Sequence, residues 1–457
     1  MKGNSNHWGR LLPVLLLTVL LINFSIVLTS KITPSIQPND TAQEQKFTIR
    51  NAYKMWDTTW GGIYEDDSED LALDSAGNIY TVGWTNKNET FSRDFAVVKF
   101  YPNGIKAWNT TWGGGSDDFG NGIAVDSSNN IYTVGITSSF GAGSSNLVVV
   151  KFDLNGIEVW NTTWGSSAYE DGNGIALDSA GNIYAVGTTY TISPDFSDFS
   201  VVKFYPNGTV AWNTTWGGSA YNEDGYEIAL DTAGNIYTVG STNGFGAGGF
   251  DLVVVKFYPD GTVAWNTTWG GVNFDEGYGI ALDPAGNIYT VGSTNSFSVG
   301  LSDLVVVKFH SNGTQAWNTT WGGSYGDDGY GIALDPTGNI YTSGETFSFG
   351  AGIYDLVMVK FYPNGMKAWN TTWGGNKFDK GSKIAVDSVG NIYINGITFS
   401  YGVGGDFVVV KFLDRSTTTT WISGFLLIPV IIGVLLIPLI LKRKAEILLV
   451  NQASTGG

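Results

Sequence analysis

The sequence predicts an all-β fold, a seven-bladed β-propeller of four-stranded antiparallel blades that is closed by its N-terminal strand. Three observations support this. A Trp-x-Thr-Thr-Trp signature occurs seven times, and its second Trp recurs every 52 or 53 residues. Each unit contains short runs of Val, Ile, Tyr and Phe that are bounded by Gly, Asn and Asp, as strands are. A period of about 40 to 50 residues with several such runs is typical of a propeller.

The second unit shows the four strands in chain order, and we name them a to d. They are expected at Gly122–Asp126, Ile131–Ile136, Leu147–Phe152 and Glu158–Trp164. Most units connect a to b through Asp-x-x-Gly-Asn and c to d through Pro-Asn-Gly or Pro-Asp-Gly. Both are tight turns that need Gly or Asn at positive φ.

The order of strands at the two ends of the array predicts how the ring closes. The array begins with a d-type strand at Tyr53–Trp60 and ends with a c-type strand at Phe407–Phe412. The first d strand therefore completes the last blade, which pairs an edge that would otherwise be open. An open array like a solenoid is the alternative, and it would leave both ends incomplete.

Two residue types repeat in every unit and read as scaffold. The two Trp of each signature lie four residues apart, so they share one face of strand d and should pack against the neighbouring blade. A Lys ends every c strand, and we expect it to pair with an Asp at the end of strand a, such as Asp74 or Asp126, or to extend to the edge. These Lys are Lys99, Lys151, Lys203, Lys256, Lys308, Lys360 and Lys411.

Composition excludes several functions. The net charge is −17, whereas a nucleic-acid surface needs clustered Lys and Arg. The chain has no Cys, so disulfide and thiolate chemistry is absent. Only His7 and His310 are available for imidazole chemistry or zinc binding.

Two apolar segments bracket the repeats and predict a membrane protein. Residues 1–30 read as a secretory signal peptide or an uncleaved signal anchor. Residues 421–441 carry no charge and are long enough to form a transmembrane helix. The Lys-Arg-Lys cluster that follows places the tail, 442–457, in the cytoplasm. The propeller at 53–412, between linkers at 31–52 and 413–420, is then extracellular, with its a–b and c–d turns facing the membrane and its b–c and d–a loops distal.

The repeat resembles the SBBP-type β-propeller repeat of prokaryotic surface proteins. The resemblance lies in Ile-Ala-Leu-Asp-x-x-Gly-Asn-Ile-Tyr-x-x-Gly, then Asp-Leu-Val-Val-Val-Lys-Phe, then Trp-x-x-Thr-Trp-Gly-Gly, and it covers about residues 53 to 412. It implies the propeller fold and suggests an archaeal cell-envelope protein, but it brings no catalytic motif.

Pairs of acids precede strand a in nearly every unit, and we expect them on the d–a loops near the central opening. A ring of carboxylates there could attract Ca²⁺, which prefers several oxygen ligands, or a basic partner. The alternative is that these acids only accept hydrogen bonds from backbone amides in the turn. Phe119 and Lys380 occupy the two non-acidic positions. The candidate metal ligands are Asp66, Asp67, Asp118, Glu170, Asp171, Glu223, Asp224, Asp275, Glu276, Asp327, Asp328 and Asp379.

Glycosylation is expected on the outermost strand of an extracellular blade, where Asn-Thr-Thr recurs. The alternative is that Asn and Thr simply form the solvent-facing side of strand d. The acceptor residues are Asn109, Asn161, Asn213, Asn266, Asn318 and Asn370.

These observations favour a membrane-anchored extracellular propeller that acts as a binding or cell-envelope structural module through its distal loops. A protein or a glycan is the expected partner. A metal-assisted hydrolase or lyase in the central pocket is the alternative, but an enzyme should break the repeat symmetry where catalysis occurs. The visible breaks are Trp84, Phe119, Lys380, Lys383 and His310. A passive spacer without a ligand is a third hypothesis.

Overall fold

The computed structural model describes residues 47–48, 52–86, 92–190, 196–218, 220–414 and 418–419. It divides into two units, Arg50–Ser416 and the two chain ends. In the second of these, β1 (Phe47–Thr48) pairs with β30 (Thr418–Thr419). The expected signal segment, 1–30, and transmembrane segment, 421–441, lie outside the described residues. Within the described residues we find no helix that is long and apolar enough to cross a bilayer.

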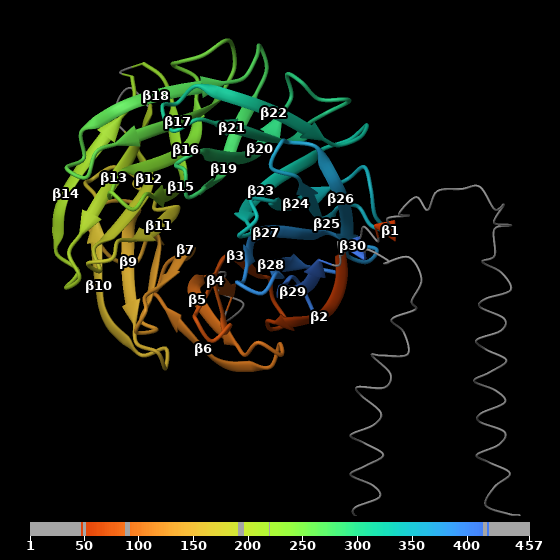
Figure 1. Cartoon of the computed structure of the whole chain (residues 1–457). Coiled ribbons are helices and arrows are strands. Elements are labelled where there is room, and N and C mark those ends of the chain that lie inside the picture. The colour runs from red at the N-terminus through yellow and green to blue at the C-terminus, as the bar shows by residue number, and fades with distance from the viewer. Residues whose placement is uncertain are drawn as a thin grey trace, which may run out of the picture. The chain divides into compact units, whose positions relative to one another are not determined.

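The first unit is a ring of seven four-stranded antiparallel sheets, which we number as blades 1 to 7 in chain order (Figure 1). Blade 1 consists of β3 (Asp66–Leu73), β4 (Ile79–Asn86), β5 (Arg93–Phe100) and β6 (Lys106–Trp112). Blade 2 consists of β7 (Asp118–Val125), β8 (Ile131–Thr137), β9 (Asn146–Phe152) and β10 (Glu158–Trp164). Blade 3 consists of β11 (Gly174–Leu177), β12 (Ile183–Tyr190), β13 (Ser197–Phe204) and β14 (Val210–Trp216).

The remaining blades repeat this order. Blades 4 to 7 consist of β15 (Glu223–Leu230), β16 (Ile236–Thr242), β17 (Asp251–Phe257) and β18 (Val263–Trp269); β19 (Asp275–Leu282), β20 (Ile288–Thr294), β21 (Asp303–Phe309) and β22 (Gln315–Trp321); β23 (Asp327–Leu334), β24 (Ile340–Thr346), β25 (Asp355–Phe361) and β26 (Lys367–Trp373); and β27 (Asp379–Val386), β28 (Asn391–Thr398), β29 (Asp406–Asp414) and β2 (Ala52–Trp60).

The predicted closure is confirmed. The N-terminal strand β2 pairs antiparallel with the last strand, β29, from Ala52↔Asp414 to Trp60↔Phe407. A core cluster that joins Phe407 and Val409 of blade 7 to Ile79 and Val98 of blade 1 then fills the seam. The last blade of the ring therefore has its full set of four strands where the first and last strands of the propeller meet.

Strand a is innermost and strand d outermost in every blade. Figure 1 shows β3, β7, β11, β15, β19, β23 and β27 around the middle of the ring, where the a strands of neighbouring blades contact one another. Strand d and strands b and c were predicted almost to the residue, as β8, β9 and β10 show. Strand a begins earlier than predicted: β7 starts at Asp118, not at Gly122. The acids expected on the d–a loops are therefore, in six blades, the first residues of strand a.

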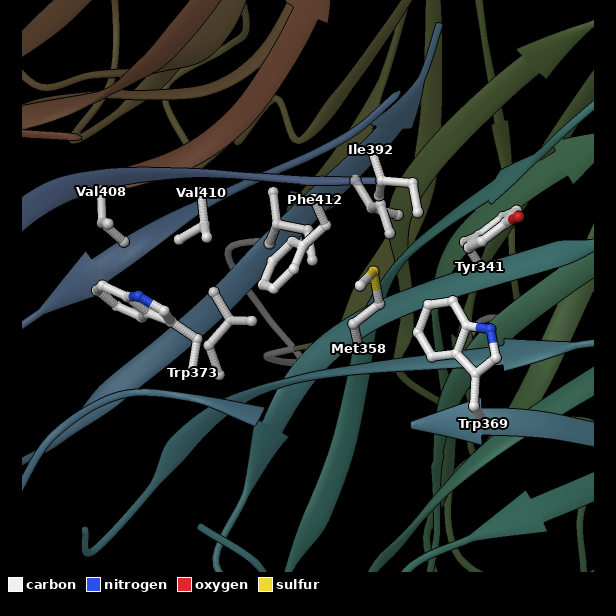
Figure 2. Close-up of a cluster of buried hydrophobic side chains, with 11 residues drawn as sticks. Tyr341, Met358, Trp369, Trp373, Ile392, Val408, Val410 and Phe412 are labelled. Atoms are coloured by element: carbon white, nitrogen blue, oxygen red, sulfur yellow. The ribbon is translucent and has the colours of Figure 1, made fainter. Parts of the chain in front are cut away.

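The hydrophobic core lies between the blades rather than inside any one of them. Between blades 6 and 7, Met358 and Trp373 of one blade pack against Val408, Val410 and Phe412 of the other (Figure 2). The side chains of Val408 and Val410 are completely buried. Such apolar contacts between sheets are the main stabilising term of a propeller, since a single blade cannot bury its own faces.

The Trp pairs of strand d are structural, as predicted. The second Trp is buried in most blades, and in blades 1, 3 and 7 it meets a Phe of strand c, as Trp112 meets Phe95 at a centroid distance of 5.4 Å. The first Trp packs under the c–d turn of the next blade: a Cβ on Gly261 would lie 3.0 Å from the Trp212 ring. Because Gly261 also has a φ of +86°, glycine is required there on two counts.

In six blades the Lys at the end of strand c forms no salt bridge within 4.0 Å with the Asp that ends strand a among the described residues, and in blade 6 Lys360 pairs with Asp414 of blade 7. Each Lys Nζ lies over the ring of a strand-b Tyr, as Lys256 lies 4.8 Å from the centroid of Tyr237. The hydroxyl of that Tyr donates to Asp231, 3.2 Å away, which also accepts from Asn235. A cation–π contact therefore stands where we expected an ion pair, because the aromatic ring lies between the two charges.

Candidate functional site

The first acid of each pair is a structural residue at the start of the a strand. These side chains are at most 1% exposed, and one carboxylate oxygen accepts a backbone N–H from the preceding turn, as from Gly271 to Asp275 at 2.7 Å. In blade 4 the other oxygen accepts from Thr242 at 3.1 Å. The residues are Asp66, Asp118, Glu170, Glu223, Asp275, Asp327 and Asp379. The hydrogen bonds satisfy a buried charge and tie the d–a turn to the blade.

The second acid of each pair lies between its own blade and the preceding one. Asp224 of blade 4 accepts from Ser197 of blade 3 at 3.0 Å. At the non-acidic positions, Phe119 packs against Trp84 of blade 1, and the Lys380 Nζ lies over Tyr330 of blade 6. The five acids of this set are Asp67, Asp171, Asp224, Glu276 and Asp328. The twelve candidate ligands are thus split between two different environments.

No cluster of three His, Asp or Glu side chains that could hold a metal ion occurs among the described residues. Backbone amides and hydroxyls donate to the first acids, which matches the hydrogen-bonding alternative for these residues. Calcium binding by the acidic ring stays a prediction.

A β-bulge in strand a marks a residue that differs from blade to blade. The pairing of strand a with strand b shifts register at this point in six blades, for example between Gly277 and Gly279 around Tyr278. Bulges re-aim a side chain, and here the residues at this position all line one cavity of about 280 Å³. They are Glu69, Asn121, Asn173, Tyr226, Tyr278, Tyr330 and Ser382; Lys380 and Lys383 complete the lining. Because they come from the innermost strand of all seven blades, this cavity is the axial channel of the ring.

Blades 4 to 6 give the channel an aromatic wall. The rings of Tyr226 and Tyr278 lie 5.2 Å apart, and those of Tyr278 and Tyr330 lie 5.3 Å apart, each pair tilted by about 50°. The Tyr278 hydroxyl donates to Glu276, and the Tyr330 hydroxyl donates to Glu345 at 3.0 Å. The hydroxyls are therefore used by the protein, and the rings are left to contact a ligand.

Blades 2 and 3 give the channel an amide wall. The Asn121 side-chain amide donates to the Gly172 carbonyl at 2.9 Å, and the Asn173 amide donates to the Gly225 carbonyl at 2.8 Å. Each Asn thus ties its blade to the next one. The Asn121 amide also donates to the Asn173 side-chain oxygen at 3.3 Å, so the Asn121 oxygen and the second lone pair of the Asn173 oxygen are the groups that this wall can offer to a ligand.

Lys383, which lines the cavity, belongs to a group of charged residues from blades 1, 4 and 7. Lys383 pairs with Glu227 at 2.5 Å and donates to the Tyr278 carbonyl at 3.3 Å. Blades 7 and 4 are three blades apart, so this ion pair crosses the axis. Burial, with repulsion from Glu227, raises the pKa of Asp70 to about 7, even though Lys383 opposes that rise.

Two further channel carboxyls have raised pKa values. Burial and repulsion from Glu69 raise the pKa of Asp67 to about 8, against the lowering effect of Lys380. Burial raises the pKa of Asp171 to about 7, although the Thr188 N–H donates to it at 2.5 Å. Groups that titrate near neutral pH are typical of functional sites, although structural networks show them as well.

The loops and sequons that the sequence singled out lie away from this cavity. Most b–c loops place a half-exposed aromatic ring against the second Trp of the preceding unit, as Phe297 does on Trp269 at 5.0 Å. The six predicted acceptor Asn residues lie on the outermost strands, where all except Asn370 are exposed. Glycan attachment stays a prediction, and His310 lies in a c–d turn.

Sequence reasoning identified Lys380 and Lys383 as breaks in the repeat but missed the bulge residues. A signal was present. In blades 2 to 6 the residue after the constant Gly of strand a and two positions before the constant Ile-Ala reads Asn, Asn, Tyr, Tyr and Tyr. The bulge could not be read from the pattern, because an extra residue there only interrupts the alternation of a short strand.

Comparison with known proteins agrees with this architecture. The SBBP β-propeller repeat matches at residues 61–89, 111–141, 216–246 and 272–297. The chain carries SBBP-type β-propeller repeats. An uncharacterized WD repeat-containing protein of Acanthamoeba polyphaga mimivirus is 24% identical over 381 residues, which are 68% of this chain and 27% of that protein. The chain thus spans about a quarter of the length of this relative.

A solved structure has the same fold as this chain. The WD40 domain of Neurospora crassa Pan2 matches with a TM-score of 0.52 at 12% identity, covering 81% of this chain and 98% of the other. A gluconolactonase of Xanthomonas campestris matches with a TM-score of only 0.38 at 11% identity, covering 80% and 100%. The first likeness concerns the fold, and the second is too distant to bear on activity.

Proposed function

We propose that this protein is a membrane-anchored, extracellular binding module that takes its ligand in the axial channel. One observation carries the proposal: at the bulge position of strand a the blades carry different residues, and all seven of these residues line one cavity of about 280 Å³. A scaffold alone gives no reason for Tyr, Asn, Glu and Ser to alternate there. A binding site needs unlike groups gathered in one concave place.

The proposal places the site differently from the sequence hypothesis of a binding surface on the distal loops. The channel-lining residues lie within strand a, whose N-terminal end is on the d–a and b–c side of the ring. We therefore expect the ligand to enter from the side that the anchoring argument turns away from the membrane.

A thermal-shift screen of a small-molecule library tests the proposal. The full chain is compared with Asn121→Trp, whose larger side chain fills the channel. Binding in the channel predicts compounds that raise the melting temperature of the natural sequence and have no effect on the variant. A matched control, Asn155→Trp in the exposed c–d turn of blade 2, should keep every such response. Responses that survive Asn121→Trp, or no response at all, would contradict a channel site.

A further inference from the structure

We infer that the channel binds a compact organic cation, an ammonium group held between Tyr278 and the acids of blades 5 and 6. This inference rests on the proposed function and names the ligand class of the same site. It starts from a contact that the protein already makes elsewhere in the channel.

Lys380 shows how an ammonium is held in this channel. It is the second residue of the a strand of blade 7, and its Nζ lies 4.7 Å from the centroid of the Tyr330 ring on blade 6. Glu69, Asp67 and Glu345 surround it and raise its pKa further, against the effect of burial. An aromatic face with carboxylates around it is a favourable environment for a desolvated cation.

Blades 5 and 6 have the same arrangement as blades 6 and 7, but without a Lys over the Tyr ring. The bulge residue of blade 5 is again a Tyr, Tyr278, but the second residue of the next a strand is Asp328 where blade 7 has Lys380. One further blade back, Tyr226 is followed by Glu276. Among the described residues no Lys or Arg lies over the ring of Tyr226 or Tyr278. An external ammonium can therefore occupy the place that the Lys380 side chain fills beside Tyr330.

Four carboxylates next to the Tyr residues of the channel wall lack a cationic partner within salt-bridge distance. Asp171, Asp224, Glu276 and Asp328 come from successive blades, and none of them is within 4.0 Å of a Lys or Arg nitrogen in the part of the chain that the structure describes. Burial, with repulsion from Asp224 and Asp328, raises the pKa of Glu276 against the lowering effect of the hydrogen bond from Tyr278. A bound cation would relieve this repulsion.

The channel also has a buried hydroxyl that the protein leaves unused. Ser382 is 3% exposed, lines the cavity, and its Oγ has no hydrogen-bond partner among the described residues. A buried polar group without a partner costs stability, so its place on the cavity wall is consistent with a partner that a ligand supplies. Its oxygen and the amide oxygens of the Asn wall favour a ligand rich in N–H donors.

Putrescine is the probe, because the cavity volume suits a small diamine, and 1,4-butanediol is its uncharged counterpart of similar length. Calorimetric titration of the full chain should show putrescine binding at least about 30-fold more tightly than butanediol. Raising the salt concentration should weaken the binding of putrescine only. A short peptide with one Lys, titrated in parallel, distinguishes a free amine from a lysine side chain as the natural source.

Matched variants locate the site. Tyr278→Leu and Asp328→Asn should each weaken putrescine binding by about 10-fold, whereas Tyr278→Phe keeps the ring and should retain binding within about 3-fold. Tyr258→Leu and Asp260→Asn, in the exposed c–d turn of blade 4, make the same chemical changes outside the channel and should have no effect. The melting temperature of each variant shows whether it is folded.

The outcomes separate this inference from the proposed function. Equal binding of putrescine and butanediol would overturn the inference of a cationic ligand and leave the channel site standing. Binding of glucose, an uncharged probe, that is lost in Tyr278→Leu would do the same. Putrescine binding that is unchanged in both channel variants would overturn the inference by placing the cation elsewhere. If no probe binds, and the library screen gives no response that depends on the channel, both proposals fail.

Discussion

The rim and the axis of this propeller are built from the same repeat, yet they follow opposite rules. At the rim, strands b, c and d are nearly the same in every blade, as in Asp-Leu-Val-Val-Val-Lys-Phe of both β17 and β21. At the axis, the bulge residue changes from Glu69 to Asn121 to Tyr278. The buried apolar side chains of these strands pack against the neighbouring blade, so one solution serves all seven. The axis faces a cavity, and packing does not fix its residues.

The same contrast appears in the carboxylates. At the a–b turns, hydrogen bonds from Asn182 lower the pKa of Asp178 even though burial alone raises it. Along the axis, burial dominates and raises the pKa of Asp171 to about 7. Ionised turn carboxylates therefore stabilise the folded state, whereas the charge on the axial carboxylates destabilises it. Destabilisation of this kind is kept where function needs it, not where folding does.

Removal of the closing strand should have the largest effect. Deletion of residues 1–60 removes β2 and leaves the edge of β29 and the buried ring of Phe407 open. We expect the free energy of unfolding to fall by at least about 4 kcal/mol, with association between open edges. Thermal melting and size-exclusion chromatography measure both effects. Deletion of residues 1–49, which keeps β2, is the control, and equal melting of the two proteins would show that the ring is not closed by this strand.

Packing at the rim can be separated from turn geometry with two glycines. Gly261 (φ +86°) would place a Cβ 3.0 Å from Trp212, whereas Gly390 (φ +85°) has open space around it. Gly390→Ala should therefore cost about 1 kcal/mol of backbone strain, and Gly261→Ala about 2 to 3 kcal/mol because the Trp must move as well. Urea denaturation compares them. Equal losses would mean that the first Trp of strand d does not support the next blade.

The axial carboxylates predict how stability depends on pH. The folded pKa of Asp171, about 7, lies above its unfolded value, so the folded state binds more protons between about pH 4 and pH 7. Its effect on the free energy of unfolding is therefore unfavourable at pH 8 and disappears as the pH falls towards 4. Asp171→Asn should stabilise the protein by about 1 to 2 kcal/mol at pH 8 and have little effect at pH 4. Denaturation curves at the two pH values test this.

The turn carboxylates supply the opposite control. The folded pKa of Asp178 is lowered, so its contribution is present at neutral pH and is lost as the pH falls through that lowered value. Asp178→Asn should destabilise the protein at pH 8. If both variants shift stability in the same direction at pH 8, the distinction between axis and rim is wrong.

Much of this fold could be read from the sequence, because the rim encodes it redundantly. The seven Trp pairs, the Asp-x-x-Gly-Asn turns and the displaced first d strand were enough to predict seven blades and the β2–β29 closure. The start of strand a was missed because Gly120 and Gly122 and the bulge between them interrupt the alternation. The Lys–Tyr contacts were missed because spacing along the chain does not show that Tyr237 lies between Lys256 and Asp231.

The candidate site was harder to predict, because its residues are related only through the ring. The salt bridge of Lys383 with Glu227 joins residues 156 positions apart, and no local pattern connects them. The acid pairs were recognised, but the sequence did not show that Asp275 is buried in a turn while Glu276 lies beside the Tyr278 hydroxyl. Alternation along strand a separates the two members of each pair.

The most direct test of the account exchanges one part of the axis for another. Tyr226, Tyr278 and Tyr330 are replaced together by Asn, the residue that blades 2 and 3 carry at the same position, and putrescine is titrated into the variant. Because packing at the rim is untouched, we expect the melting temperature to stay within about 6 °C of that of the natural protein. Binding should weaken by at least about 30-fold. Unchanged binding, or a variant that no longer folds, would contradict the claim that the axis carries function while the rim carries the fold.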